Sequence, residues 1–291
     1  MLSIYEEKIN IYFEIKGVPD SSRESYTRRI AAFAEHIQRQ GGCLESVVES
    51  DIQQYILHLK NDKRLAPGTI NNYISAIRVF YVHILKREWE QISVPRMKKV
   101  TKFPIIPPRE DILAIIDATE NLKHKAFLSL MYGSGLRVGE VAKLKIGDIC
   151  SKSMRIRVDN AKHGTNRYTI LSVATLDVLR KYFVMYFFNT RYKLDDWLFK
   201  GREHGTHVSV RTIKNTLLNL RNRLDLEPGI SSHTLRHCFA THSLEDGVDP
   251  VFIQQLLGHK SLLTTRQYLH MTSKSLMGIK SPLDTFNGDT V

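Results

Sequence analysis

The feature that most constrains the fold is a basic, proline-rich stretch that divides the chain in two. It reads QISVPRMKKVTKFPIIPPR, from Gln91 to Arg109, and holds four prolines and five basic residues but no acidic one. Proline fixes its own backbone torsion and disfavours helix in the residue before it, so no helix can run through this stretch. We therefore expect a linker at residues 93–108, whose charge suits either contact with phosphates or plain exposure to water.

The residues before the linker, 1–92, predict a domain of four helices. Three segments carry apolar residues at steps of three and four, which is the spacing of one helix face. They begin near Ser21, Ser50 and Pro67, and the pair Ser21 and Glu24 has the spacing of a capping box. A helix near residues 3–16 is the fourth.

The residues after the linker, 109–291, predict a mixed domain. The segments MRIRVDN and RYTIL alternate as strands do, and the turn between them contains Gly164, so we expect a β-hairpin. The fold class is therefore mainly α with a small β-sheet (α+β). The expected helices are at 110–118, 122–131, 138–144, 174–188, 210–224, 233–245, 250–257 and 263–270.

The composition favours a polyanionic partner. The chain has 42 basic and 30 acidic residues, which gives a formal net charge of +12. Such a charge fits nucleic acid, although a basic protein with another role remains an alternative. The three cysteines form no pair in the sequence, which suits a reducing cytoplasm. We expect no signal peptide, because the N-terminus lacks a basic start and an apolar core. We also expect no membrane partner, because the most apolar stretch, YFVMYFF, is far too short to span a bilayer.

The first two candidate functional sites are a glycine-rich motif and a histidine-containing motif. YGSGLRVGEVAKL resembles a dinucleotide-binding turn but misses its glycine spacing by one position, which leaves Arg137 as a surface residue or an anion contact. In SSHTLRHCFATH, His233 and His237 are four residues apart and could share a metal ion. His233 and Arg236 also share a helix face, and their donors suit a phosphate better than a cation.

A third motif, LLGHKSLLTTRQYLH, contains His259 after a helix-ending glycine and Tyr268 on the next helix. Taken singly, His259 is typical of a helix end and Tyr268 of a core residue.

Taken together, these motifs resemble the signature of the tyrosine recombinase (phage integrase) family. That signature is an arginine in Gly-Leu-Arg-x-x-Glu, a lysine in a β-hairpin, His-x-x-Arg, Leu-Gly-His and a following tyrosine. This chain fills all six positions in order, with Arg137, Lys162, His233, Arg236, His259 and Tyr268. The chain starts directly with the helical domain, which points to the minimal Xer-like, integron-like or transposon-borne branches rather than to integrases with an additional arm-binding domain.

The resemblance implies a site-specific DNA recombinase that needs neither metal nor cofactor. Tyr268 would attack a DNA phosphate and form a 3′-phosphotyrosyl bond, and strands would be exchanged through a Holliday junction. Arg137 and Arg236 would stabilise the charge on the phosphate, and Lys162 would protonate the leaving 5′-oxygen. His233 and His259 would donate hydrogen bonds, and His233 would be a candidate to move the tyrosine proton.

The resemblance also implies partners and leaves alternatives open. The expected partners are double-stranded DNA with specific sites and three further copies in a homo-tetramer. An apolar tail from about residue 272 would either dock on a neighbouring copy or pack on its own domain, and a second recombinase or an accessory protein is a further alternative. The expected location is the cytoplasm. A type IB topoisomerase-like enzyme, which religates one duplex without exchange, and a catalytically silent DNA-binding relative are the competing functions.

Overall fold

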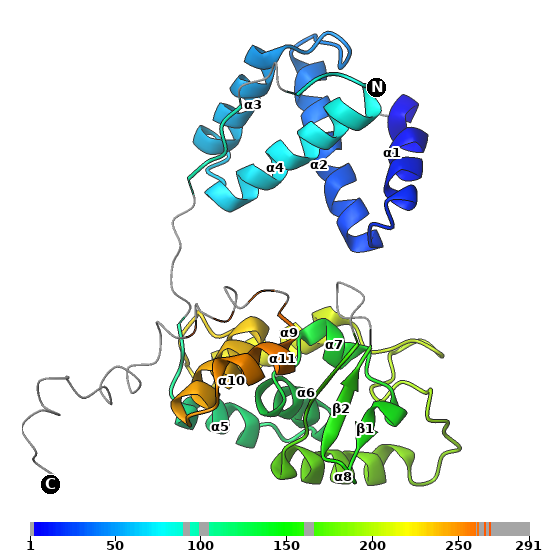
Figure 1. Ribbon diagram of the computed structural model, residues 1–291, viewed down its shortest axis with the longest axis vertical. Coiled ribbons are helices and arrows are strands. Elements are labelled where there is room, and N and C mark those ends of the chain that lie inside the picture. Colours follow the sequence, from blue (N-terminus) through cyan, green and yellow to red (C-terminus); the bar gives the residue numbers. More distant parts are fainter. Residues whose placement is uncertain are drawn as a thin grey trace, which may run out of the picture. The chain divides into compact units, whose positions relative to one another are not determined.

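The computed structural model describes residues 3–89, 94–98, 105–159, 166–259, 261, 265 and 268. The chain forms two compact units, Met1–Lys102 and Phe103–Val291, and each is described here by itself (Figure 1). Among the described residues, no helix is both long enough and apolar enough to span a bilayer.

The first unit is built from four helices, as the apolar spacing predicts. They are α1 (Ser3–Ile15), α2 (Asp20–Arg39), α3 (Glu49–Asn61) and α4 (Pro67–Val79), and a π-helical turn follows at Phe80–Ile84. Helix α4 packs against α2 and α3, so the apolar faces of these helices meet in one core. Phe33, Ile52 and Ile77 are fully buried in it.

Helix α2 does not begin with the capping box that was predicted at Ser21, so that prediction is wrong. The helix begins at Asp20 and follows Pro19, whose backbone is extended (φ −57°, ψ 144°), and no side chain caps it. Proline favours this extended geometry directly before a helix and needs no hydrogen-bond partner for its nitrogen.

Part of the expected linker packs against the first unit. The side-chain amide of buried Asn71 on α4 donates to the carbonyl of Met97 (2.9 Å) and accepts from its backbone N–H (2.8 Å). Val94 and Met97 also pack against the hydrophobic core of the first unit. The described residues 94–98 are therefore held on α4.

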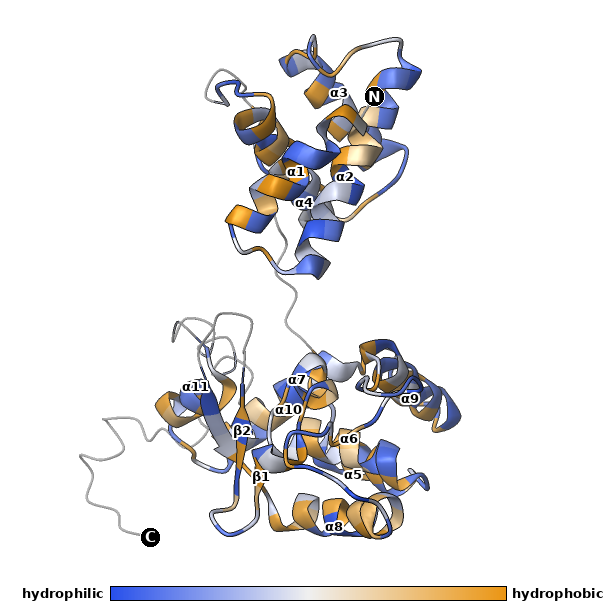
Figure 2. Ribbon diagram, turned by 90° about the vertical axis from the view of Figure 1, so that its right-hand side faces the viewer, coloured by the Kyte–Doolittle hydropathy of each residue, from blue (hydrophilic) through white to orange (hydrophobic). Residues whose placement is uncertain are grey.

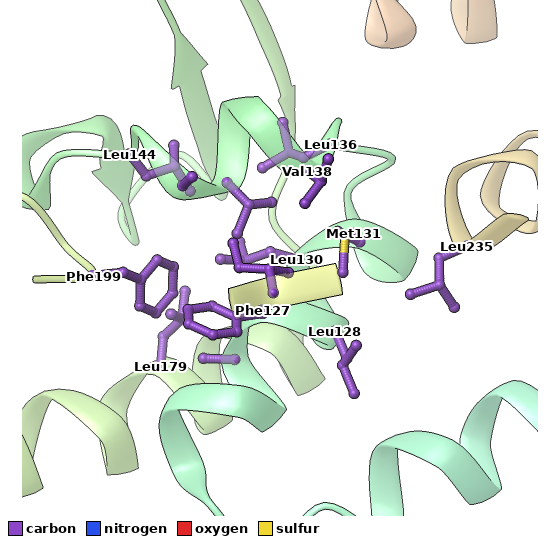
Figure 3. Close-up of a cluster of buried hydrophobic side chains, with 14 of the residues drawn as sticks. Phe127, Leu128, Leu130, Met131, Leu136, Val138, Leu144, Leu179, Phe199 and Leu235 are labelled. Carbon is purple, nitrogen blue, oxygen red and sulfur yellow. The ribbon is translucent and has the colours of Figure 1, made fainter. Parts of the chain in front are cut away.

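The second unit surrounds one central helix. Its helices are α5 (Arg109–Asp117), α6 (Leu122–Gly133), α7 (Val138–Ala142), α8 (Val173–Phe187), α9 (Val210–Arg223), α10 (Ser232–Glu245) and α11 (Pro250–Leu257). Helix α6 contacts α5, α7, α8, α9 and α10, and every residue from 126 to 131 is buried. Figure 3 shows this core, where Phe127 and Leu130 of α6 meet Leu179 of α8 and Phe199. Helices such as α9 are instead striped with hydrophilic and hydrophobic residues in Figure 2, which is typical of helices with one face in the core.

The second unit also holds a small antiparallel sheet of three strands in the order β1 (Ile149–Cys150), β2 (Arg155–Val158) and β3 (Arg167–Ile170). Strands β2 and β3 form the predicted hairpin, with Ile156 opposite Thr169 and both side chains buried. Strand β1 was not predicted, because two residues are too few to show an alternation. The predicted hairpin turn at residues 160–165 lies outside the described residues, as does most of the predicted helix 263–270.

Candidate active site

The turn between α6 and α7 holds Arg137 beside α10. Gly135 has a left-handed backbone (φ +64°), and a Cβ at this position would lie 2.4 Å from the ring of Phe239 on α10. Only glycine allows so close an approach in this conformation. Arg137 precedes α7, and its backbone N–H and its Nη1 donate to the two carboxylate oxygens of Glu140 at 2.8 and 2.9 Å.

Glu140 is the acidic centre of an arginine cluster. Arg167 on β3 donates to both of its carboxylate oxygens, at 2.9 and 2.8 Å, and both side chains are only 8% exposed. Arg236 Nη1 lies 3.8 Å from the same carboxylate. Burial alone would raise the pKa of Glu140, but the hydrogen bonds and charge of Arg167, with Arg137 and Arg236, lower this pKa to about 2. Glu140 is therefore ionised at neutral pH.

Arg236 connects three segments of the site. It is buried, its Nη1 donates to the carbonyl of Gly135 (2.7 Å), and its Nη2 donates to the carbonyl of Leu257 at the end of α11 (2.6 Å). Burial, followed by the charge of Arg137, lowers the pKa of Arg236 to about 9. The guanidinium still carries its charge at pH 7, so buried positive charge lies at the junction of the α6–α7 turn with α10 and α11.

His259 lies directly after α11 and contacts Arg236. Gly258 ends α11 in the left-handed conformation, which turns the chain and directs His259 toward the cluster. His259 Nε2 lies 3.3 Å from Arg236 Nη2, and Nδ1 lies 2.9 Å from the hydroxyl of Thr265. Because arginine can only donate, Nε2 accepts and the ring proton is on Nδ1. Burial, followed by the charge of Arg236, lowers the pKa of His259 to about 4, so its ring is neutral at pH 7.

His233 lies one helical turn before His237 at the start of α10, and it is exposed. Partial burial of its ring, followed by the charges of Lys214 and Arg236, lowers the pKa of His233. It is thus a neutral group at the edge of the arginine cluster at pH 7.

Tyr268 is buried, with 1% of its surface exposed, and its hydroxyl lies 2.9 Å from His237 Nδ1. Its ring is nearly parallel to that of His259, with 6.2 Å between the centroids. Burial lowers the pKa of His237, with smaller effects from His233 and Arg236. His237 is the neighbour of the tyrosine that the sequence did not predict; its only signal was the four-residue spacing from His233, which suggested a metal instead.

The structure thus brings five of the six predicted site residues into one region of the second unit: Arg137, His233, Arg236, His259 and Tyr268. Lys162 lies outside the described residues. Within the part of the chain that the structure describes, no three histidine, cysteine or acidic side chains are arranged to hold a metal ion. The dinucleotide alternative fails because the glycine turn follows helix α6, whereas a dinucleotide-binding turn follows a strand.

The charges of this region suit an anion. Three guanidinium groups, of Arg137, Arg167 and Arg236, face the single carboxylate of Glu140, which leaves an excess of positive charge. Planar guanidinium groups are well matched to phosphate oxygens, and they remain charged when partly buried. The region is therefore chemically suited to a phosphate group beside a tyrosine hydroxyl.

Comparison with known proteins covers both units. The sequence model of the phage integrase family matches residues 108–275, and that of the phage integrase N-terminal SAM-like domain matches residues 7–91. A Sinorhizobium fredii protein named as an integrase/recombinase is 34% identical over 93% of this chain and 85% of its own length. Tyrosine recombinase XerD of Oceanobacillus iheyensis is 28% identical over 90% of this chain and 91% of its own length.

Solved structures show the same fold. The XerH site-specific recombinase, in a post-cleavage complex with its palindromic difH substrate, superposes with a TM-score of 0.73. It is 19% identical, and the match covers 95% of this chain and 83% of that one. The Tn1549 transposon integrase in complex with transposon right-end DNA gives a TM-score of 0.72 at 18% identity, over 96% of both chains.

Proposed function

Because the chain belongs to the phage integrase family and is a tyrosine recombinase, an enzyme that cuts and rejoins DNA, we propose that Tyr268 is its nucleophile. The phenol oxygen attacks the scissile phosphorus, a 3′-phosphotyrosyl bond forms, and the 5′-oxygen leaves. The covalent bond conserves the energy of the phosphodiester, so rejoining needs no ATP. The proposal is carried by one observation: the Tyr268 ring stacks beside His259, which in turn contacts Arg236.

The arginine cluster would bind the scissile phosphate. Arg137 and Arg236 stabilise the negative charge that grows on the non-bridging oxygens, and guanidinium groups held in place by Glu140 need little rearrangement to do so. His233 donates a further hydrogen bond from the exposed edge of the cluster. Lys162 remains the proposed general acid for the leaving oxygen.

His259 needs a change of partner before it can donate to a phosphate through Nε2. In the structure this nitrogen accepts from Arg236. A phosphate that draws the Arg236 donors toward itself would release Nε2 and would also raise the pKa of the ring, since an added negative charge favours the imidazolium. We therefore assign the donor role of His259 to the DNA-bound state.

Tyr268 must also be uncovered before it can react. Its side chain is 1% exposed, so a phosphate in the DNA backbone cannot reach the hydroxyl until the groups that cover it move aside. DNA binding would supply the energy for this movement, so that the nucleophile is protected in the free protein.

The substrate of the proposed reaction is double-stranded DNA with specific recombination sites. XerH and the Tn1549 integrase are solved with such DNA, and the net charge of +12 suits it here. We further propose that four copies exchange strands through a Holliday junction in the cytoplasm, with the tail from about residue 272 linking neighbours. That tail lies outside the described residues. A second recombinase or an accessory protein would be added to this assembly rather than replace it.

The test uses a nicked duplex that carries the recombination site, identified from the repeats that flank the gene. Cleavage next to the nick releases a short strand and traps the covalent protein–DNA adduct. We expect the native protein to form the adduct and Tyr268→Phe to form none, while both bind the duplex equally. An adduct of undiminished yield with Tyr268→Phe would exclude Tyr268 as the nucleophile. Exchange of strands between two differently labelled duplexes would separate recombination from religation within one duplex.

A further inference from the structure

The residue in contact with the reacting oxygen is His237. Its Nδ1 lies 2.9 Å from the Tyr268 hydroxyl, although 31 residues separate the two in the chain. The rings also meet at a centroid distance of 5.4 Å and an angle of 50°. His233, the histidine that the family resemblance suggested for moving the tyrosine proton, is exposed one turn earlier on α10.

We propose that His237 is a further catalytic residue, which accepts the phenol proton as Tyr268 attacks the phosphate. The proposal rests on Tyr268 as the nucleophile. As the bond between Oη and phosphorus forms and the bond from phosphorus to the 5′-oxygen breaks, the phenol proton moves from Oη to Nδ1, and Lys162, the proposed general acid, gives its proton to the leaving 5′-oxygen. In the rejoining step the 5′-hydroxyl returns that proton to Lys162 as it attacks phosphorus, the Oη–phosphorus bond breaks, and His237 returns its proton to the phenol oxygen.

The surroundings of His237 keep it ready for this role. Half-burial and the neighbouring His233 and Arg236 on α10 lower its pKa, so the ring is neutral and can accept a proton at pH 7. From outside α10 it faces the hydroxyl of Tyr268 and the ring of His259 after α11, and the pKa of His259, about 4, leaves that ring neutral at pH 7. The imidazolium that forms would be stabilised by the phosphate that the arginine cluster holds, and the charge remains within one site.

The free phenol explains why such an acceptor is useful. A tyrosine with an ordinary pKa near 10 is phenolate in only about one molecule in a thousand at pH 7. A base within hydrogen-bond distance removes the proton during the attack and does not require a phenolate beforehand. Acid–base catalysis of this kind typically contributes between about 100-fold and 10,000-fold in rate.

The variant that tests the proposal is His237→Gln, which can still hydrogen-bond to Tyr268 but cannot take up a proton. We expect its single-turnover cleavage of the nicked duplex to be about 100-fold slower at pH 7. Its rate should rise roughly tenfold per pH unit between about pH 7 and 9, since hydroxide must now remove the proton, while the native rate is flat over that range. Added imidazole should partly restore cleavage by His237→Ala.

The chain provides a matched control on the same helix. His242 Nδ1 lies 3.0 Å from the hydroxyl of Tyr132. This pair has the same type of hydrogen bond as the His237–Tyr268 pair, but neither residue belongs to the arginine cluster. His242→Gln should lose comparable stability, as measured by urea unfolding, and should keep the native pH profile of cleavage.

Each other outcome overturns the proposal. A native rate and profile for His237→Gln would show that no proton passes to this residue. Slower cleavage by His237→Gln with an unchanged pH profile would show that the contact has only a structural role. Faster cleavage would show that the contact restrains the tyrosine. These results leave the Tyr268→Phe test intact, so failure of the inference is distinct from failure of the nucleophile. Nitrogen-15 NMR of the native protein adds a check without mutation: the proton of the neutral His237 ring should be on Nε2, and a proton on Nδ1 contradicts the proposal.

Discussion

At the scale of single residues, Glu140 shows how one buried carboxylate can organise several cations. It receives both arms of the Arg167 guanidinium and the side chain of Arg137, and it lies 3.8 Å from Arg236. Removing one partner of a buried ion pair leaves the other charges uncompensated, which costs far more than losing a surface pair. Glu140 is thus a positioning residue for the phosphate site and a determinant of stability.

Glu140→Gln should make this contribution visible as a pH dependence. The folded-state pKa of about 2 lies below the ordinary glutamate value of 4.5, so the carboxylate stabilises the fold fully above about pH 4.5 and loses this effect as the pH falls toward 2. A shift of this size corresponds to about 3 kcal/mol. Urea unfolding should show the free energies of native and Glu140→Gln proteins far apart at pH 7 and progressively closer as the pH falls from about 4.5 toward 2.

The control for this experiment is Glu110→Gln, which removes an exposed carboxylate from α5. It should change the free energy of unfolding by less than about 0.5 kcal/mol at pH 7. A constant difference between native and Glu140→Gln proteins from pH 7 to pH 3 would contradict the assigned pKa of Glu140.

At the scale of elements, the site depends on how closely the α6–α7 turn approaches α10. Gly135 is in the left-handed conformation, its carbonyl accepts from Arg236, and a Cβ there would lie 2.4 Å from Phe239 and 2.9 Å from Leu257. The turn therefore fixes both the spacing of the helices and one acceptor of the buried guanidinium.

Gly135→Ala and Gly139→Ala form a matched pair within this motif. Gly139 lies on α7 with no neighbour within 4 Å of an added Cβ. Gly135→Ala should lower the free energy of unfolding by roughly 2 to 4 kcal/mol through strain and overpacking. Gly139→Ala should change it by less than about 1 kcal/mol, in the stabilising direction. Equal losses in urea unfolding of the two variants would show that the approach of Phe239 is not what requires glycine.

The elements also show what a sequence can and cannot predict. Helices with regular apolar faces, such as α2 and α4, and the β2–β3 hairpin follow from local spacing, and the structure confirms them. Strand β1 has two residues, so it leaves no pattern, and α2 starts after Pro19 for a backbone reason that side-chain spacing does not reveal. The order of the motifs along the chain was enough to predict the residues of the site, but it could not predict which of them contact one another.

The hydrogen bond from His237 to Tyr268 is the clearest example of that gap. It joins residues 31 positions apart, so only tertiary packing brings the two side chains together. The bidentate bond of Arg167 to Glu140 is similar, because β3 and α7 meet only through tertiary packing. Spacing along one helix, which paired His233 with His237, could suggest a metal site but could not show that one of the two rings faces the tyrosine.

At the scale of the whole molecule, the two units have separate hydrophobic cores. The cluster around Phe33 draws its members from residues 5–97, and the cluster around Phe127 draws its members from residues 106–238. No described residue belongs to both clusters. Because each unit has its own core, each should be able to unfold without loss of the other core.

The two tryptophans allow a direct test of independent unfolding, since each unit contains one. Trp89 packs edge-on against Tyr81 in the first unit, and Trp197 donates to the carbonyl of Gly205 in the second. Trp197→Phe leaves a reporter of the first unit, and Trp89→Phe leaves a reporter of the second. Adding Phe33→Ala should destabilise the first unit by about 3 to 5 kcal/mol, because it opens a cavity at a fully buried position.

In urea unfolding followed by fluorescence, Phe33→Ala should therefore lower the midpoint reported by Trp89 and leave that of Trp197 unchanged. The reciprocal variant, Phe127→Ala, removes an equally buried ring from the second unit and should shift only the Trp197 transition. If either variant moves both transitions together, the units unfold as one cooperative body.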